Sequence, residues 1–331
     1  MDINIGIIGS GQIIYQGLVM PVMQTKVATV YGIASRNLEK AQSCAVKCKI
    51  PHVFATFDEL LGCPEINLVY VALPNHLHSE MIIKAAEQGK HILVEKPVCL
   101  STEEFGAICA ACEKNQVHLL EGIMVQHHPW QRYLQQFITE GSLGRLQQVV
   151  TKISFIPQYD LNCNYRAYPE YGGGCFFDLG PYWVQFIQSI LGLEVNSLEG
   201  RSDFSGSHQA DLSFQAKLFF PREIEASMLA SFERPYEASH ELVFEKGIVK
   251  VDNFFKPNMG RHKLTLWIEN QELGQNEAIK FPPQNYFINQ LEFLVEVIKG
   301  TARNIDIRDS GERVRMMDLI YRDAKRNHET Q

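Results

Sequence analysis

The sequence predicts an α/β protein: an N-terminal Rossmann domain followed by a C-terminal α+β domain built on a large, mostly antiparallel open sheet. In the first third of the chain, short apolar runs alternate with amphipathic segments, which is the pattern of βαβ units and a parallel sheet. A glycine-rich turn follows the first apolar run. Later runs alternate apolar and polar residues with few helices between them, which is typical of antiparallel strands.

The elements of the first half follow from local signals. Residues 3–9 form an apolar strand, and Gly9-Ser10-Gly11 turns the chain into a helix that ends near residue 24. Strands are also predicted over residues 27–34, 66–72, 91–94 and 117–120. Residues 37–49 read as a helix, and capping residues at Thr56 and Ser101 open two more. Gly89 ends a helix over residues 77–88.

The second half is predicted to be richer in strands. They cover residues 146–156, 211–220, 223–232, 240–244, 248–251 and 264–268. Helices are expected over residues 175–191, 286–299 and 310–326. The change in pattern places the boundary near Glu121-Gly122, which gives domains over residues 1–122 and 123–331.

Composition narrows the class of protein. The chain has 331 residues, of which 45% are hydrophobic and 21% charged, as in a globular protein with a sizeable core. The net charge is −7 and no basic patch is present, so we expect no nucleic-acid partner. Without a membrane-length apolar run or a signal peptide pattern, we expect no membrane association and a cytoplasmic location.

The eight cysteines do not predict a metal site. Cys109 and Cys112 have CxxC spacing, but no second pair at zinc-ligand spacing accompanies them. They are interpreted as small buried hydrophobic residues of a helix.

The glycine turn and the end of the second strand predict a dinucleotide site. Backbone N–H groups at a helix start bind pyrophosphate, although Ile14 stands where the fingerprint has a third glycine. An acidic residue ending the second strand would bond the ribose of NAD, whereas a serine and an arginine suit the 2′-phosphate of NADP. NADP(H) is therefore the expected cofactor, and the alternative is a helix cap beside a solvated arginine. The predicted contacts here are Gly9, Gly11, Gln12, Ile13, Ser35, Arg36 and Lys40.

Two more loops follow strands at the same edge of the predicted sheet. Glu95-Lys96-Pro97 places a charged pair at the end of a buried strand, where α/β sheets bind ligands and where a lysine can reach a substrate oxygen. The loop over residues 73–78 follows the preceding strand. Solvated histidines in a simple helix cap are the alternative there. The predicted cofactor contacts of the two loops are Leu73, Pro74, Asn75, His78, Glu95 and Lys96.

The third cluster is Gly172-Gly173-Gly174 followed by Asp178 and Tyr182. The carboxylate and the phenol are four residues apart, on one face of a helix. Core packing does not explain two such polar groups in an otherwise apolar segment. Alternatively, Asp178 caps the helix and Tyr182 packs in a domain interface.

The order of these motifs resembles the glucose–fructose oxidoreductase, inositol dehydrogenase and rhizopine-catabolism (Gfo/Idh/MocA) oxidoreductases, over essentially the whole chain. The resemblance implies hydride transfer between nicotinamide and a sugar or polyol. It implies that Lys96 binds the substrate oxygen and the nicotinamide ribose, and that Tyr182 is the acid/base residue. We further expect Asp178 to orient the substrate or the lysine, and Glu95 to position Lys96.

Within that family, the chain is most similar to NADPH-dependent ketoreductases acting at C3 of nucleotide-linked sugars. This likeness rests on Tyr182, on residues 33–36, on the His127-His128-Pro129 step and on Arg166. It implies a sugar or nucleotide-sugar substrate bound by His127, His128, Arg166, Asp178 and Tyr182. The alternatives are an NADP-dependent aldose or trans-dihydrodiol dehydrogenase and a non-catalytic NADP sensor or scaffold. A homodimer or homotetramer is expected, since an exposed sheet face usually finds a partner.

Overall fold

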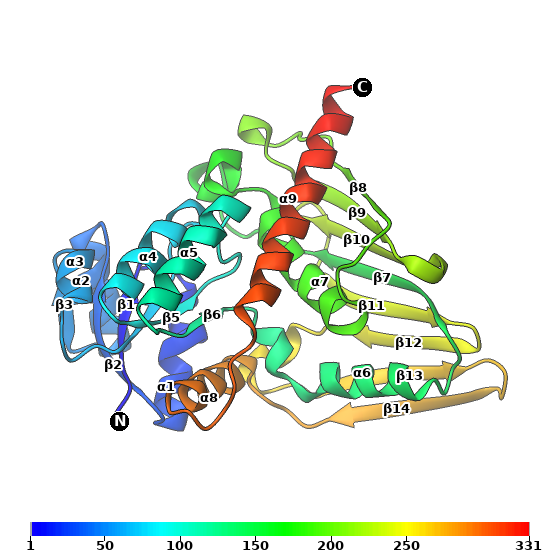
Figure 1. Cartoon of the computed structure of the whole chain (residues 1–331), viewed down its shortest axis with the longest axis horizontal. Helices are drawn as coiled ribbons and strands as arrows, with labels where there is room; N and C mark the ends of the chain where they lie inside the picture. The colour runs from blue at the N-terminus through cyan, green and yellow to red at the C-terminus, as the bar shows by residue number, and fades with distance from the viewer. Residues whose placement is uncertain (1, 331) are drawn as a thin grey trace. The chain divides into compact units, whose positions relative to one another are not determined.

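The structure, a computed structural model, describes residues 2–330 apart from the side chains of residues 258 and 259. It forms two compact units (Figure 1). The first comprises Met1–Met124 and Phe287–Val314, and the second Val125–Tyr286 and Arg315–Gln331. The segment 287–314, which lies beyond the expected boundary, thus packs with the first unit. That residues 1–122 bind NADP(H) and residues 123–331 bind the substrate stays a prediction.

The first unit is built on a six-stranded parallel sheet in the order β3-β2-β1-β4-β5-β6. Its strands are β1 Asn4–Ile8, β2 Thr29–Ala34, β3 His52–Phe54, β4 Leu68–Val71, β5 His91–Val94 and β6 Leu119–Glu121. The order reverses between β1 and β4, and ligands of such sheets bind beyond the carboxyl ends of the strands at this switch point. The predicted parallel sheet is confirmed. Strand β3, which is short and largely exposed, was not predicted.

Helices cover both faces of this sheet, and one hydrophobic core lies on each face. They are α1 Met20–Thr25, α2 Leu38–Cys48, α3 Phe57–Leu61, α4 His78–Glu87, α5 Thr102–Lys114 and α8 Tyr286–Ile298. One core joins α3, α4 and α5 to the sheet, and the other joins α1, α2 and α8 to it. Figure 1 shows α4 and α5 side by side. Strands buried on both faces explain the continuous apolar runs in the sequence.

The predicted helix caps are present. Asn37 Oδ1 accepts a hydrogen bond from an N–H in the first turn of α2 at 2.9 Å. Thr56 Oγ1 and Ser101 Oγ accept from the N–H groups of Glu59 and Glu104 at 3.1 and 3.2 Å. These two carboxylates accept N–H groups just before the helices in return. Side chains thereby satisfy N–H groups that the helices leave unpaired.

The helix after the glycine turn contains a π-helical segment, Tyr15–Val19. Pro21 lies in the first turn of α1, directly after this segment. Proline has no N–H to donate, and in a regular helix its ring would clash with the carbonyl of Gly17, four residues earlier. The wider π turn removes this conflict. The predicted helix is therefore present but bulged.

The second unit is built on an eight-stranded sheet in the order β14-β13-β12-β11-β7-β10-β9-β8. Its strands are β7 Leu146–Ser154, β8 Ser197–Arg201, β9 Ser213–Phe219, β10 Glu225–Ser231, β11 Glu237–Phe244, β12 Gly247–Asp252, β13 Leu264–Asn270 and β14 Gln275–Phe281. Only β7 and β10 pair in parallel. The mostly antiparallel open sheet is confirmed, and the edge strands β8 and β14 were missed.

Three long helices belong wholly or partly to this unit. They are α6 Pro129–Glu140, α7 Cys175–Leu191 and α9 Ile307–Glu329, of which α9 begins in the first unit. Every residue of α7 from Cys175 to Ile187 is buried, and the helix packs on β9, β10 and α6. Helices α7 and α9 were predicted from the sequence, and α6 was not.

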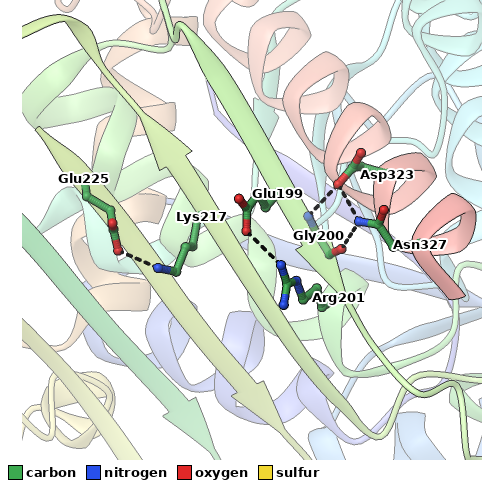
Figure 2. A network of polar contacts seen from close by, with 7 residues as sticks. All are labelled: Glu199, Gly200, Arg201, Lys217, Glu225, Asp323 and Asn327. Carbon is green, nitrogen blue, oxygen red and sulfur yellow. Dashed lines mark hydrogen bonds and ion pairs between the residues drawn. The ribbon is translucent and has the colours of Figure 1, made fainter. Parts of the chain in front are cut away.

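The end of α9 covers an edge strand (Figure 2). Gly200 of β8 donates its N–H to Asp323 at 2.9 Å, and its carbonyl accepts from Asn327 at 3.0 Å. A Cβ atom at Gly200 would lie 2.2 Å from the carbonyl oxygen of Ile320. Only glycine allows the helix this close, and the helix side chains pair backbone groups that an edge strand otherwise exposes.

No helix within residues 2–330 is long and apolar enough to cross a membrane.

Candidate functional site

The glycine turn after β1 brings the backbone of residue 9 close to the backbone that follows β4. Gly9 has φ 122°, and a Cβ atom there would lie 2.3 Å from the carbonyl oxygen of Ala72. Gly11 is exposed, as is the adjoining Gln12, while Ile13 is half-buried. The turn can therefore present backbone N–H groups to a phosphate.

The missing third glycine has a structural explanation. Ile14 is 1% exposed and packs in one of the two cores of the first unit. The close packing comes three residues later, at Gly17, where a Cβ atom would lie 3.0 Å from the hydroxyl of Tyr70. The helix therefore packs close to the sheet although Ile14 replaces the third glycine of the fingerprint.

The end of β2 carries a hydroxyl and a guanidinium. Ser35 is buried, and its Oγ lies 3.1 Å from Ser10 Oγ of the glycine turn. Arg36 and Lys40 are exposed. Within the part of the chain that the structure describes, no carboxylate pairs with Arg36. A cation beside a hydroxyl and the glycine turn fits a phosphate group.

The loop after β4 is joined to the loop after β5 through His78. This side chain is fully buried. Its Nδ1 lies 2.8 Å from the carbonyl oxygen of Pro97, and its Nε2 lies 2.9 Å from that of Leu73. Two carbonyl partners favour a doubly protonated ring, whereas burial lowers the pKa of His78 and favours the neutral ring. Asn75 is also buried, and Pro74 is half-buried.

Lys96 begins a loop that is fixed on several sides. Glu95 accepts a hydrogen bond from the hydroxyl of Tyr70. Lys96 is half-buried, and the peptide bond to Pro97 is cis. The N–H of Val98 donates to Glu121 Oε1 at 3.0 Å. The sequence predicted the importance of this loop, but not the residues that hold it.

The glycines before α7 allow the helix to start against other backbone and one buried acid. A Cβ atom at Gly173 would lie 2.6 Å from the carbonyl oxygen of Tyr168, and one at Gly174 would lie 1.9 Å from Asp211 Oδ1. Gly174 has φ 93° and offers no capping side chain. Asp211 replaces that cap, because its Oδ2 accepts the N–H of Phe176 at 2.7 Å.

The sequence pattern did not predict a role for Asp211, and its environment is unusual for an acid. It is 0% exposed, and burial raises its pKa to about 7, against the opposing effect of the Phe176 N–H and the Cys175 thiol. Tyr321 and Lys325 are the other titratable groups that interact with it. In the sequence, Asp211 is a single acid two residues before β9, without a periodic signal.

Because its folded-state pKa is raised, Asp211 favours folding most below about pH 4 and loses that contribution as the pH rises through about 7. We therefore expect the free energy of unfolding to fall by roughly 2–3 kcal/mol from this group between about pH 5 and about pH 8. Asp211→Asn cannot ionise and should remove this part of the pH dependence. Denaturant unfolding of both proteins at the two pH values measures it.

Asp203→Asn is the matched control, because Asp203 is exposed in the same unit and its replacement makes the same chemical change without removing a buried acid. Equal pH dependence of the wild type and Asp211→Asn would show that Asp211 is ionised throughout this range.

Asp178 and Arg166 form an ion pair in the second unit. Arg166 Nη2 lies 2.9 Å from Asp178 Oδ1, and both side chains are largely buried. Burial opposes the charge on Arg166, and the Asp178 carboxylate reverses this and raises the pKa of Arg166. The guanidinium carbon lies 4.8 Å from the centre of the Tyr165 ring. Both charged residues were predicted from the sequence as site residues, but their pairing was not.

Tyr182 lies one turn after Asp178 on α7 and is 9% exposed. Its ring makes an edge contact with Phe255, with centroids 4.7 Å apart. The ring thus packs within the second unit.

The two histidines before α6 differ in their surroundings. His128 is 2% exposed, and its Nδ1 lies 3.2 Å from the N–H of Trp130 and caps α6. Its ring packs edge-on against Tyr286. His127 is half-buried, and burial lowers its pKa to about 4. Substrate contact by either residue stays a prediction.

Within the described residues, no group of three or more potential ligands could hold a metal ion. Cys109 and Cys112 lie on α5, and burial raises the pKa of both thiols. Neutral thiols are poor metal ligands and poor nucleophiles.

Comparisons with known proteins cover nearly the whole chain. Residues 3–123 match the oxidoreductase family with a NAD-binding Rossmann fold, and residues 131–250 match the GFO/IDH/MocA C-terminal domain. An uncharacterized oxidoreductase of Rhizobium meliloti, ORF334, is 27% identical over 98% of both chains. D-xylose 1-dehydrogenase (NADP(+)) 2 of Haloferax volcanii is 25% identical over 97% of both chains.

A solved structure has the same fold. It is a 3-ketoreductase from Actinomadura kijaniata in complex with NADP and TDP-benzene, with a TM-score of 0.89 and 21% identity over 98% of both chains. The family matches cover both units of the chain. The chain belongs to the Gfo/Idh/MocA family of oxidoreductases.

Proposed function

We propose that the protein is an NADP(H)-dependent oxidoreductase that reduces a ketone of a sugar, with a nucleotide-linked sugar reduced at C3 as the first candidate. The observation that carries this proposal is the Lys96 loop. Glu95, Pro97 and Val98 are each held by a hydrogen bond, so the loop around the lysine is fixed before any ligand arrives. Such preorganisation is what stabilisation of a developing negative charge requires.

The residues at the end of β2 fit NADP(H) rather than NAD(H). Ser35 and Arg36 would hold the 2′-phosphate, and the turn at Gly9 and Gly11 would hold the pyrophosphate. The three residues directly after β2 are Ser35, Arg36 and Asn37, and none of them is a carboxylate that could bond a free 2′-hydroxyl.

When bound, NADPH supplies the hydride that converts the ketone into an alcohol. Lys96 stabilises the negative charge that grows on the carbonyl oxygen. Tyr182 donates the proton that this oxygen takes up. Asp178 keeps Arg166 in place, and the remaining guanidinium N–H groups can contact an anionic part of the substrate.

Two observations on relatives bear on the substrate. The ketoreductase from Actinomadura kijaniata was crystallised with a TDP derivative, and a nucleotide diphosphate would suit Arg166. The likeness to a D-xylose dehydrogenase favours an aldose, oxidised with NADP⁺, as the second candidate. The expected homo-oligomer and cytoplasmic location remain predictions.

The deciding experiment follows reduced nicotinamide by its absorbance. We expect NADPH to be consumed with dTDP-linked 3-keto-sugars and to be consumed more slowly with NADH in its place. NADP⁺ reduction by D-xylose or a trans-dihydrodiol, without activity on keto-sugars, would instead select the dehydrogenase. NADPH binding without turnover of any of these would favour a sensor or scaffold.

Arg36→Glu tests the choice of cofactor. The change should raise the KM for NADPH by about 10- to 100-fold, the effect of losing a charged hydrogen bond of roughly 1.5–3 kcal/mol, and should leave the KM for NADH the same or lower. Lys47→Glu makes the same change in charge at the other end of α2 and should alter neither value much. An unchanged preference in Arg36→Glu would contradict the assignment.

A further inference from the structure

The backbone that follows Lys96 is held by side chains on two sides. The carbonyl oxygen of Pro97 lies 2.8 Å from His78 Nδ1, and the N–H of Val98 donates to Glu121 Oε1 at 3.0 Å. Pro97 and Val98 are both buried. A shift of this segment would therefore move Lys96, and the Glu121 contact is only two residues away from it.

Burying the charged side chain of Glu121 at this position costs solvation free energy. Its side chain is 4% exposed, and it ends β6 in the interior of the first unit. Arg313 of α9, whose side chain is 5% exposed, compensates the charge: its Nη2 lies 2.8 Å and its Nε 3.2 Å from Glu121 Oε2. Ser310 Oγ adds a longer contact at 3.4 Å.

The two oxygens of Glu121 thus have different partners. Oε2 faces Arg313, while Oε1 accepts the N–H of Val98. A buried ion pair adds little net stability compared with an apolar pair of similar size, so joining α9 to β6 does not by itself require one. The N–H of a buried loop does require an acceptor, and this acceptor must be held rigidly if the loop is to stay in place.

We propose that Glu121 is a positioning residue for Lys96, acting through Val98, and that Arg313 fixes Glu121 in the orientation this requires. The inference rests on the proposed role of Lys96. The C-terminal helix thereby takes part in ordering a loop more than two hundred residues earlier in the chain.

Two double variants separate the contact to Val98 from the ion pair. Glu121→Leu with Arg313→Met removes both charges and the acceptor. Glu121→Gln with Arg313→Met removes both charges but keeps an amide oxygen for the N–H of Val98. We expect the first to lower kcat by about 10- to 100-fold, the cost of slight misplacement of a reacting group, and the second to recover most of that loss. The dissociation constant for NADPH should be similar in the two, and the leucine variant should have the lower thermal midpoint because the N–H of Val98 loses its acceptor.

The same changes in a Lys96→Ala background complete the test. Glu121→Leu with Arg313→Met should then cause less than about a twofold further loss, because the group it positions is gone. If the kcat losses of Lys96→Ala and of the double variant instead multiplied, the two sites would act independently and the inference would be wrong. Wild-type kcat in the leucine variant would also overturn it. If Lys96→Ala itself turned over normally, the proposed role of Lys96 would be wrong instead.

A further variant covers failure of the leucine protein to fold. Glu121→Asp keeps the negative charge and shortens the side chain by one methylene, which draws the acceptor away from Val98. It should lower kcat without weakening NADPH binding. Full kcat in Glu121→Asp, with the N–H of Val98 exchanging with solvent faster than in the wild type, would overturn the inference.

Discussion

Replacing Lys96 by alanine is expected to lower kcat by about 100- to 1,000-fold, the loss typical of removing one preorganised donor from a developing oxyanion. The loop keeps its other attachments in this variant, because the contacts of Pro97 and Val98 involve backbone atoms. The dissociation constant for NADPH should therefore change much less than kcat. Steady-state kinetics with NADPH and the keto-sugar, together with cofactor titration by fluorescence, measure the two quantities separately.

Lys84→Ala provides the matched control. It also removes one lysine from the first unit, but Lys84 lies on α4 in an exposed pair with Glu80, at 2.8 Å. Exposed pairs of this kind contribute little, so kcat should stay within about twofold of the wild type. Turnover by Lys96→Ala within a few-fold of the wild type would remove Lys96 from the chemistry.

The sequence predicted those parts of the fold whose signals are local and strong. Buried strands such as β4 and β5 appear as apolar runs, and Thr56 and Ser101 mark helix starts through short-range hydrogen bonds. The missed strands lack such signals. All seven residues of β14 are charged, polar or only half-buried, and its pairing with β13 is what makes it a strand.

The candidate site was predictable to the same extent. A charged residue at the end of a buried strand singled out Lys96, and the same reasoning applied to β6 would have selected Glu121, which was interpreted only as a domain boundary. Its partner Arg313 could not be found in this way, since the two are 192 residues apart. Asp211 was hidden likewise: it caps α7 from 35 residues downstream of Phe176.

The glycines before α7 show how one pattern can have two explanations. Close approach of the backbone can serve a ligand or the protein itself, and Gly173 and Gly174 approach the protein's own Tyr168 carbonyl and Asp211 carboxylate. The result still concerns function, because this approach fixes the start of the helix that carries Asp178 and Tyr182.

Tyr182→Phe is expected to lower kcat by about 100- to 10,000-fold, the range for loss of a general acid. Phenylalanine keeps the ring that packs against Phe255, so the fold and the free energy of unfolding should change little. NADPH should bind as tightly as in the wild type. Without a positioned proton donor the chemical step becomes slower than product release, and deuterium at the transferred position of NADPH should then slow kcat more than it does in the wild type.

Tyr182→His separates loss of the proton donor from loss of the hydroxyl as a packing group. Imidazole can donate a proton near neutral pH, so this variant should retain more activity than Tyr182→Phe although its ring packs less closely. If Tyr182 donates the proton, Tyr182→His should be the more active variant. If Tyr182 only packs, Tyr182→Phe should be the more active one. If Tyr182→Phe were the more active of the two, the phenol would be packing and the proton would have to come from another group of the site.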